Sequence, residues 1–159
     1  MKTELLASDI EGYSGKNTLG LKLLGPSANL QELIEIYSDV ISNPLFIEKE
    51  LEIVKRDTMS YLNRKKQNYA ALTADKFYEK LFPNHPYSMN QYGTEESLVN
   101  ISQDNISKAY RETITKNNLL FSAVGNFDLE QLVECLNSNL DISDEDFLNI
   151  KDSTFTPIK

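Results

Sequence analysis

The only histidine of the chain, His85, lies in the stretch of sequence best suited to carry chemistry. Its imidazole could bind a metal, act as a general base, or pack its ring and accept a backbone hydrogen bond. A zinc site draws on several nitrogen, sulfur or carboxylate ligands, and the sequence places no second histidine and no cysteine near this one. The residues themselves therefore favour packing or a backbone hydrogen bond.

The residues that follow predict a loop that ends where a helix begins. Pro86 disfavours helical geometry at His85, so the preceding helix should end near residues 82–83. Gly93 can adopt left-handed backbone angles that close the loop, and the hydroxyl of Thr94 can cap the next helix. The loop motif of the chain is therefore His85, Pro86, Tyr87, Gly93 and Thr94.

Two acids, Glu95 and Glu96, come directly after this loop. Acidic side chains in the first turn of a helix interact favourably with the positive end of its dipole. A metalloenzyme that used His85 with one of these acids is the alternative interpretation. One histidine and two adjacent acids at the start of a helix are better explained by capping.

The charge of the chain argues against two classes of partner. Its net charge is -8 and its pI is about 4.7, whereas binding to nucleic acid or to an anionic membrane needs clustered Lys and Arg. The densest basic run, residues 64–66, is expected to be a solvated helix end. No apolar run is long enough to span a membrane and no signal peptide is visible, which favours the cytoplasm over export without fixing the compartment.

The length of the chain, 159 residues, suits one domain or a piece of a larger protein. We expect a single α+β domain over residues 1–140, and an acidic, Ser/Thr-containing linker or truncated edge over residues 141–159. Cys135 has no partner for an internal disulfide. Its position beside Leu136 predicts a small, partly buried hydrophobic residue.

Hydrophobic periodicity predicts strands in the two halves of the chain with helices between them. A turn is expected around Tyr13 and Ser14, and a half-buried strand over residues 18–24, where leucines alternate. A second strand, rich in apolar residues, is predicted over residues 119–124. Helices are predicted over residues 29–42, 47–63, 70–81, 95–99 and 102–115 and from residue 128 onward, the first with a capping box of Asn29 and Glu32.

Apolar residues at helical spacing mark the faces that we expect to be buried. Charged side chains such as that of Lys55 are expected to lie mostly outside these buried faces. The expected inward positions are Leu51, Val54, Thr58 and Tyr61 or Leu62 in one helix, Leu72, Phe77 and Leu81 in the next, and Leu129, Leu132, Val133 and Leu136 in the last.

The order of strand, helices, strand and helix fits a two-layer α+β fold in which helices pack on a sheet. Two strands are too few for an independent sheet. The N-terminal residues, other parts of a larger protein, or another copy of the chain would have to complete it. The isolated chain could therefore form a homodimer through the exposed sheet edge.

Three motifs occur in an informative order: Asn43-Pro-Leu-Phe46, then His85-Pro-Tyr87 with Gly93-Thr94, then Ala123-Val-Gly-Asn126. From about Gly12 to Leu136 the sequence resembles the pitrilysin/insulinase family of zinc metallopeptidases, which includes mitochondrial processing peptidase. The resemblance implies an antiparallel sheet covered on one side by helices. It also implies a domain that is repeated along a chain, or paired between two chains, in a clamshell that encloses an unfolded peptide.

The chain departs from this family at the residues that carry catalysis. Active repeats bind zinc through a His-x-x-Glu-His motif, and a later glutamate completes the site. Here His85 is followed by Pro-Tyr-Ser-Met, and Asp57 stands where the later glutamate would fall. Asp57 is the one candidate metal ligand, although an exposed helix charge beside Arg56 is the simpler interpretation. We expect no catalytic residue and no cofactor bound by this chain, with zinc in the catalytic repeat of the parent protein.

The resemblance favours a fragment of a degenerate, non-catalytic repeat from a bacterial zinc metallopeptidase that degrades or processes peptides. Such a domain would shape the substrate chamber, with peptide substrate and other repeats of the same chain, or a homologous subunit, as partners. Tyr61, Tyr87 and Tyr92 are candidate substrate-binding residues for a peptide strand added at a sheet edge, and core or rim packing is the alternative for each. The alternative function is an assembly domain that has lost proteolysis.

Overall fold

The computed structural model describes residues 6–144, which fall into two compact units. The first unit comprises residues 6–45 and 111–144, and the second comprises residues 46–110. Within the described part of the chain, no helix has the length and apolar character that crossing a membrane requires. The expected extents of the domain and of the tail stay predictions, and residues 145–159 of that tail lie outside the described residues.

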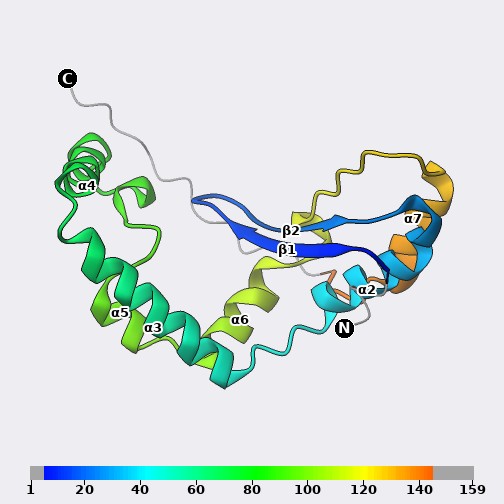
Figure 1. Cartoon of the computed structure of the whole chain (residues 1–159), viewed down its shortest axis with the longest axis horizontal. Coiled ribbons are helices and arrows are strands. Elements are labelled where there is room, and N and C mark those ends of the chain that lie inside the picture. The colour runs from blue at the N-terminus through cyan, green and yellow to red at the C-terminus, as the bar shows by residue number, and fades with distance from the viewer. Residues whose placement is uncertain (1–5, 145–159) are drawn as a thin grey trace. The chain divides into compact units, whose positions relative to one another are not determined.

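The first unit combines a β-hairpin with helices, and the second is built from helices and turns (Figure 1). The first contains β1 (Asp9–Ser14), β2 (Leu19–Leu24), the 3-10 turns η1 (Ser27–Asn29) and η3 (Lys116–Asn118), α2 (Leu30–Ser42) and α7 (Leu129–Asn139). The second contains α3 (Glu48–Lys65), α4 (Tyr69–Leu81), η2 (Pro86–Ser88) and α5 (Glu95–Val99). The helix α6 (Gln103–Thr113) begins in the second unit, and its last turn is grouped with the first.

The two strands form an antiparallel hairpin, so the predicted α+β class is confirmed. The amide of Gly15 donates a hydrogen bond to the carbonyl of Thr18 at 2.7 Å and closes the turn. The prediction of a turn at Tyr13 and Ser14 is wrong, because these are the last two residues of β1. Tyr13 lies opposite Gly20, where a Cβ would collide with the tyrosine ring, so glycine leaves room for that ring.

Helix α2 is attached to β2 through Tyr37. Its hydroxyl donates a hydrogen bond to the carbonyl of Leu21 at 2.8 Å. Burial, and after it the nearby Tyr13, raise the pKa of Tyr37 above its usual value. The phenol is therefore kept as the hydrogen-bond donor that this contact requires.

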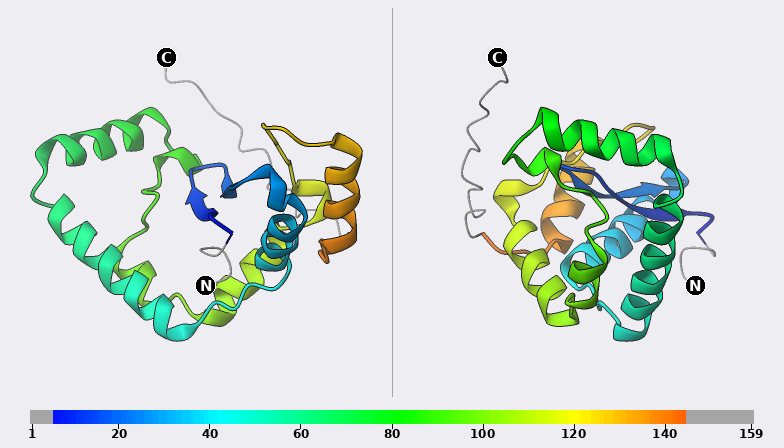
Figure 2. Two further views of the ribbon diagram at one scale, coloured as in Figure 1. Left: turned by 45° about the vertical axis from the view of Figure 1, so that its right-hand side comes forward. Right: turned by 90° about the vertical axis from the view of Figure 1, so that its left-hand side faces the viewer.

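The core of the first unit lies between α2 and α7, which are side by side in Figures 1 and 2. Its buried apolar side chains include Leu33, Ile34 and Ile41 from α2 and Leu132 from α7. The Asp128 carboxylate caps α7 by accepting the Gln131 amide at 2.9 Å. The predicted capping box of Asn29 is wrong. The side chain of Asn29 makes no cap hydrogen bond, and its Nδ2 atom donates instead to the carbonyl of Leu6.

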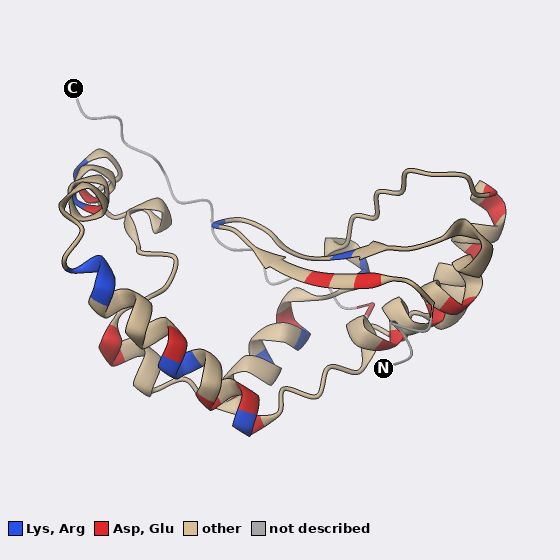
Figure 3. Cartoon of the chain, viewed as in Figure 1, with Lys and Arg blue, Asp and Glu red and all other residues tan. Residues whose placement is uncertain are grey.

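In the second unit the predicted helices form with their expected bounds to within a few residues. The first turn of α3 carries Glu48 and Glu50, and its last turn carries Arg64 and Lys65, an arrangement that complements the helix dipole. In the ribbon of Figure 3, the positions of acidic and basic residues alternate along this helix. The side chain of Asn68 caps α4 by accepting the amide of Ala71 at 3.1 Å.

Several apolar side chains that periodicity places inward are exposed, so this part of the prediction is wrong. They are Val54 (59%), Phe77 (59%), Leu129 (65%) and Val133 (47%), with Leu72 and Leu81 each exposed to 36%. Leu62 and Leu132 are buried as expected. An apolar helix face needs a second layer to cover it, and the described residues of the second unit supply no strand for α3 and α4.

The second predicted strand, residues 119–124, is also wrong. The segment begins in extended conformation, with Leu119 at φ -107° and ψ 139°. Among the described residues, however, no neighbouring strand pairs with it. Strand propensity reflects packing against neighbours more than a backbone preference, so an apolar run without a neighbour remains an unpaired extended segment.

Candidate functional site

The imidazole of His85 caps the 3-10 turn that follows it. Its Nδ1 atom accepts the amide of Tyr87 at 3.1 Å, so Nδ1 is the acceptor nitrogen of the ring in this contact. The carbonyl of the same residue accepts the amide of Ser88 at 2.9 Å and its hydroxyl at 2.7 Å. The only histidine of the chain thus makes the backbone hydrogen bond that its sequence context favours.

Aromatic rings surround this histidine. Its ring centroid lies 4.8 Å from that of Tyr87 and 5.8 Å from that of Phe82. The Phe82 ring in turn stacks on Tyr78, with centroids 6.2 Å apart and planes within 11°. We call Tyr78, Phe82, His85 and Tyr87 the ring cluster. These contacts between rings and backbone describe a packed loop.

The end of the loop is held by backbone geometry and by a reciprocal cap. Gly93 has φ +70°, and a Cβ there would come within 2.7 Å of the Ser97 hydroxyl oxygen. The Thr94 hydroxyl accepts the Ser97 amide at 3.1 Å, and the Ser97 hydroxyl accepts the Thr94 amide at 2.9 Å. The predicted helix start at Thr94 is therefore confirmed, with Ser97 as the partner in its capping box.

The three candidate tyrosines do not come together in one site. Tyr61 and Tyr92 meet ring to ring, with centroids 4.5 Å apart, whereas Tyr87 packs within the ring cluster. Lys66 pairs with Glu95 at 2.5 Å, which ties the end of α3 to the start of α5. These contacts indicate that the three tyrosines pack against neighbouring rings of the second unit. A role of these tyrosines in substrate binding stays a proposal.

Asp57, the candidate metal ligand, lies on the surface of α3. Its side chain is 67% exposed and lies 3.4 Å from the guanidinium of Arg56, the preceding residue on the same helix. Across residues 6–144, no group of three or more His, Cys, Asp or Glu side chains is placed to hold a metal ion. The donor set that a zinc site needs is therefore not assembled in the described part of the chain.

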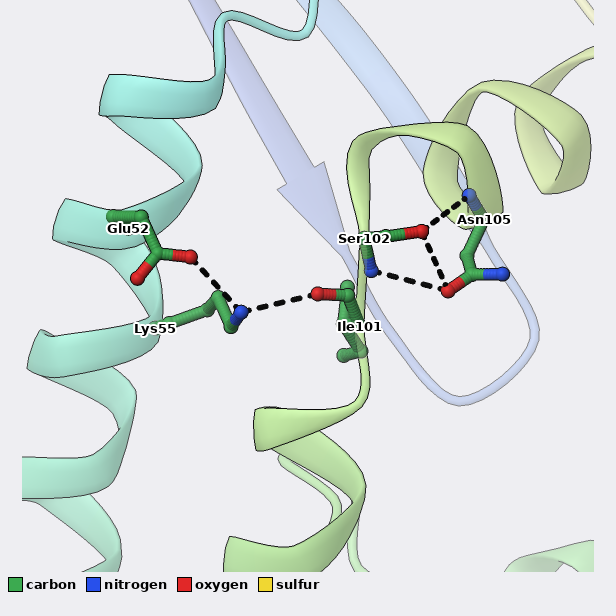
Figure 4. A network of polar contacts seen from close by, with 5 residues as sticks. All are labelled: Glu52, Lys55, Ile101, Ser102 and Asn105. Atoms are coloured by element: carbon green, nitrogen blue, oxygen red, sulfur yellow. Dashed lines mark hydrogen bonds and ion pairs between the residues drawn. The ribbon is translucent and has the colours of Figure 1, made fainter.

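Sequence reasoning missed a polar network that joins α3 to the connection between α5 and α6 (Figure 4). Lys55 was expected outside, yet its side chain is only 19% exposed. Its Nζ atom donates to the carbonyl of Ile101 at 3.0 Å and to Glu52 at 2.9 Å. Next to it, Ser102 and Asn105 cap α6 by exchanging amide-to-side-chain hydrogen bonds of 3.1 and 3.2 Å.

Two hollows are open on the surface, one in each unit. A hollow of about 530 Å³ runs along α7, beside Leu129 and Val133. The other, of about 490 Å³, lies where α4 meets η2 and includes Lys76 and Glu79. Their hydrogen bond lowers the pKa of the Glu79 carboxyl and raises that of the Lys76 amine. Neither hollow gathers the convergent polar groups that an active site needs.

No protein-family model matches the chain, but individual proteins do. It is 24% identical over 108 residues to an uncharacterized zinc protease of Rickettsia bellii, covering 68% of this chain and 26% of that protein. It is 26% identical over 109 residues to the non-peptidase homolog YmxG of Helicobacter pylori, covering 69% and 25%. A cytochrome b-c1 complex reductase subunit of Candida albicans is 24% identical over 131 residues, covering 80% and 29%. The chain thus spans about a quarter of the length of these relatives.

Comparison with solved structures shows which fold the chain has. The inactive domain of a peptidase M16 from Pseudomonas fluorescens matches with a TM-score of 0.81 at 18% identity, over 91% of this chain and 37% of that one. The chain has the same fold as this domain. A chain of complex III from Candida albicans shares this M16-type fold, with a TM-score of 0.73 at 20% identity over 97% of this chain and 39% of its own. The resemblance to zinc metallopeptidases that the motifs predicted is confirmed.

Proposed function

We propose that this chain is a non-catalytic domain of a larger zinc-peptidase-like protein, where it forms part of the wall of the substrate chamber. One observation carries the proposal: a sequence with one histidine and no His-x-x-Glu-His has the fold of a solved domain that is named the inactive domain of a peptidase M16. Such a domain contributes surface and rigidity, while zinc chemistry belongs to another repeat of the same protein or to a homologous subunit.

The uncovered apolar faces support partners of this kind. Val54 and Phe77 on the helices of the second unit are each 59% exposed, and apolar patches of this kind mark surfaces that contact another polypeptide. Other repeats of the parent protein, or a homologous subunit, would cover such faces. A peptide substrate would contact the chamber side, for which Tyr61, Tyr87 and Tyr92 are the candidate residues.

A second function is favoured by two of the relatives. One is named a non-peptidase homolog and another is a subunit of the cytochrome b-c1 complex. In this alternative the domain serves assembly within a protein that no longer cleaves peptides. The two functions differ in one property of the parent protein, which is whether it hydrolyses polypeptides.

Zinc binding and proteolysis together test the proposal. Calorimetric titration of the purified chain with Zn²⁺ should show no stoichiometric binding, and the Asp57→Ala and His85→Ala variants should give the same trace. The full-length parent protein, supplied with zinc, should cleave an unfolded polypeptide and lose this activity with a chelator. Tight one-to-one zinc binding to the chain, lost in either variant, would overturn the non-catalytic role. A parent protein without cleavage would establish the assembly function instead.

A further inference from the structure

The segment Leu119–Val124 is extended and unpaired. No backbone hydrogen bond within the described part of the chain involves its amides or carbonyls, and Leu120 and Val124 are 94% and 100% exposed. Figure 1 shows it as a plain trace that leads into α7. An extended backbone with unpaired donors and acceptors is a template for another strand.

The sequence of this segment carries none of the features that block strand pairing. Natural sheet edges are protected by charged side chains, above all lysine, and by proline. From Asn117 to Phe127 the sequence contains neither a charged residue nor a proline. The chain has a net charge of -8, yet two copies that met along this segment would bring no like charges face to face.

The side chains of the segment divide between two faces, as in a strand. Phe121 meets the ring of Tyr37 on α2, with centroids 6.4 Å apart and planes at 65°, and it is 39% exposed. Leu120 and Val124, one residue before it and three after it, belong to the opposite face and are almost fully exposed. One face is therefore turned to the unit's own helix, and the other is free to meet solvent or a partner.

We propose that Leu119–Val124 pairs with the same segment of a second copy of this chain, as two antiparallel strands related by a two-fold axis at Ser122. Opposite residues of an antiparallel pair lie on one face of the sheet, so the helix-facing and exposed residues of the two copies must match. With Ser122 opposite itself, Leu120 lies opposite Val124 of the second copy and Phe121 lies opposite its Ala123, and both faces match.

A second copy fits this site better than a foreign peptide does, because the segment itself has the properties that a strand pairing with it would need. It is uncharged, it contains no proline, and its two ends present apolar side chains of similar size on the exposed face. Two-fold symmetric pairing also gives hydrogen-bond partners, in both copies at once, to the amides and carbonyls that face the partner strand. The inference concerns the isolated chain and does not depend on the proposed function.

Cysteine cross-linking tests the register directly. In an antiparallel pair the Cα atoms of opposite residues are about 4.5 or 5.5 Å apart, within the range of about 4.4–6.8 Å that a disulfide requires. In a Cys135→Ser background, Ser122→Cys should therefore form a covalent dimer under mild oxidation. The matched control is Ser60→Cys, which lies exposed on α3 and should remain monomeric on a denaturing gel.

Lysine substitution tests the surface. Light scattering should show a concentration-dependent dimer for the unmodified chain, and the pair Leu120→Lys and Val124→Lys should abolish it. The control Val54→Lys, on a side chain 59% exposed in the second unit, should leave the dimer unchanged. Circular dichroism should stay unaltered in every variant, because these side chains are exposed.

Three outcomes would overturn the proposal. They are a monomer at all concentrations, a dimer that survives both lysine substitutions, and a Ser122→Cys variant that cross-links no faster than Ser60→Cys. In the second case the copies meet elsewhere. In the third they meet along another register or another surface.

Discussion

Two segments of this chain, the loop of residues 84–94 and the segment Leu119–Val124, use their polar groups in opposite ways. In the loop, the side chains of His85, Asn90 and Thr94 each accept a hydrogen bond from a nearby backbone amide, and each of these bonds is 3.1 Å long. In the segment, no backbone group is paired within residues 6–144. The residues that by sequence were best suited to catalysis or metal binding thus form a turn. The apolar segment, residues 119–124, is the one that has unpaired backbone groups available to a partner.

The largest effect that bears on this comparison should come from a matched pair of leucines. Leu33 is 3% exposed between α2 and α7, whereas Leu120 is 94% exposed. At a protein concentration at which the chain is monomeric, we expect Leu33→Ala to lower the free energy of unfolding by about 2–5 kcal/mol, and Leu120→Ala to change it by less than about 0.5 kcal/mol. Urea unfolding followed by circular dichroism measures both. Equal losses would mean that the segment is buried in solution.

A matched pair of glycines tests how tightly the loop is built. Gly93 has φ +70° and little room for a Cβ, whereas a Cβ on Gly12 would meet nothing within 4 Å. Gly93→Ala should cost about 1–3 kcal/mol of stability because of its left-handed backbone. Gly12→Ala should stay near the wild type in the same urea titration. A tolerated Gly93→Ala would show that the loop adopts another conformation in solution.

Removing the imidazole should have a smaller effect. His85→Ala deletes the acceptor of the Tyr87 amide and should cost about 0.5–1.5 kcal/mol, the net value of one hydrogen bond. Hydrogen exchange should speed up at that amide and remain unchanged in α7. Asp57→Ala, on the exposed surface of α3, is the control. A loss in Asp57→Ala as large as that in His85→Ala would contradict the surface assignment of Asp57.

The smallest effect should come from alkaline titration of Tyr37. Its pKa is raised from 10.0 in the folded chain, so folding stabilises the neutral phenol. That contribution is present below pH 10 and is lost as the pH rises through the folded pKa. Ultraviolet titration should show one late-ionising tyrosine that disappears in Tyr37→Phe. A Tyr37→Phe variant with an unchanged titration curve would show that another tyrosine is the late one.

The helices of this fold could be predicted from sequence because their signals are local. The hydroxyl of Thr94 and the carboxylate of Asp128 cap the helices that start after them. The hydrogen bond of His85 reaches only two residues along the chain. Interactions of this range need no knowledge of the rest of the molecule.

What could not be predicted depends on partners far along the chain. Lys55 looked like a solvated charge, because the carbonyl that it binds lies 46 residues away. Nothing in the pattern brings Tyr61 together with Tyr92. The strand predicted over residues 119–124 failed for the same reason, since a strand exists only when a neighbour supplies its ladder.

The packing of α2 against α7 sets the order in which the chain becomes structured during synthesis. Among the described residues, the second unit is one continuous stretch, residues 46–110, whose contacts join α3 to α5 and α4 to η2. It can form soon after it leaves the ribosome. The first unit is completed later, because α7, which packs against α2, is translated after the second unit. Throughout that interval the face of α2 that packs against α7 is uncovered by it, and a chaperone has the opportunity to bind there.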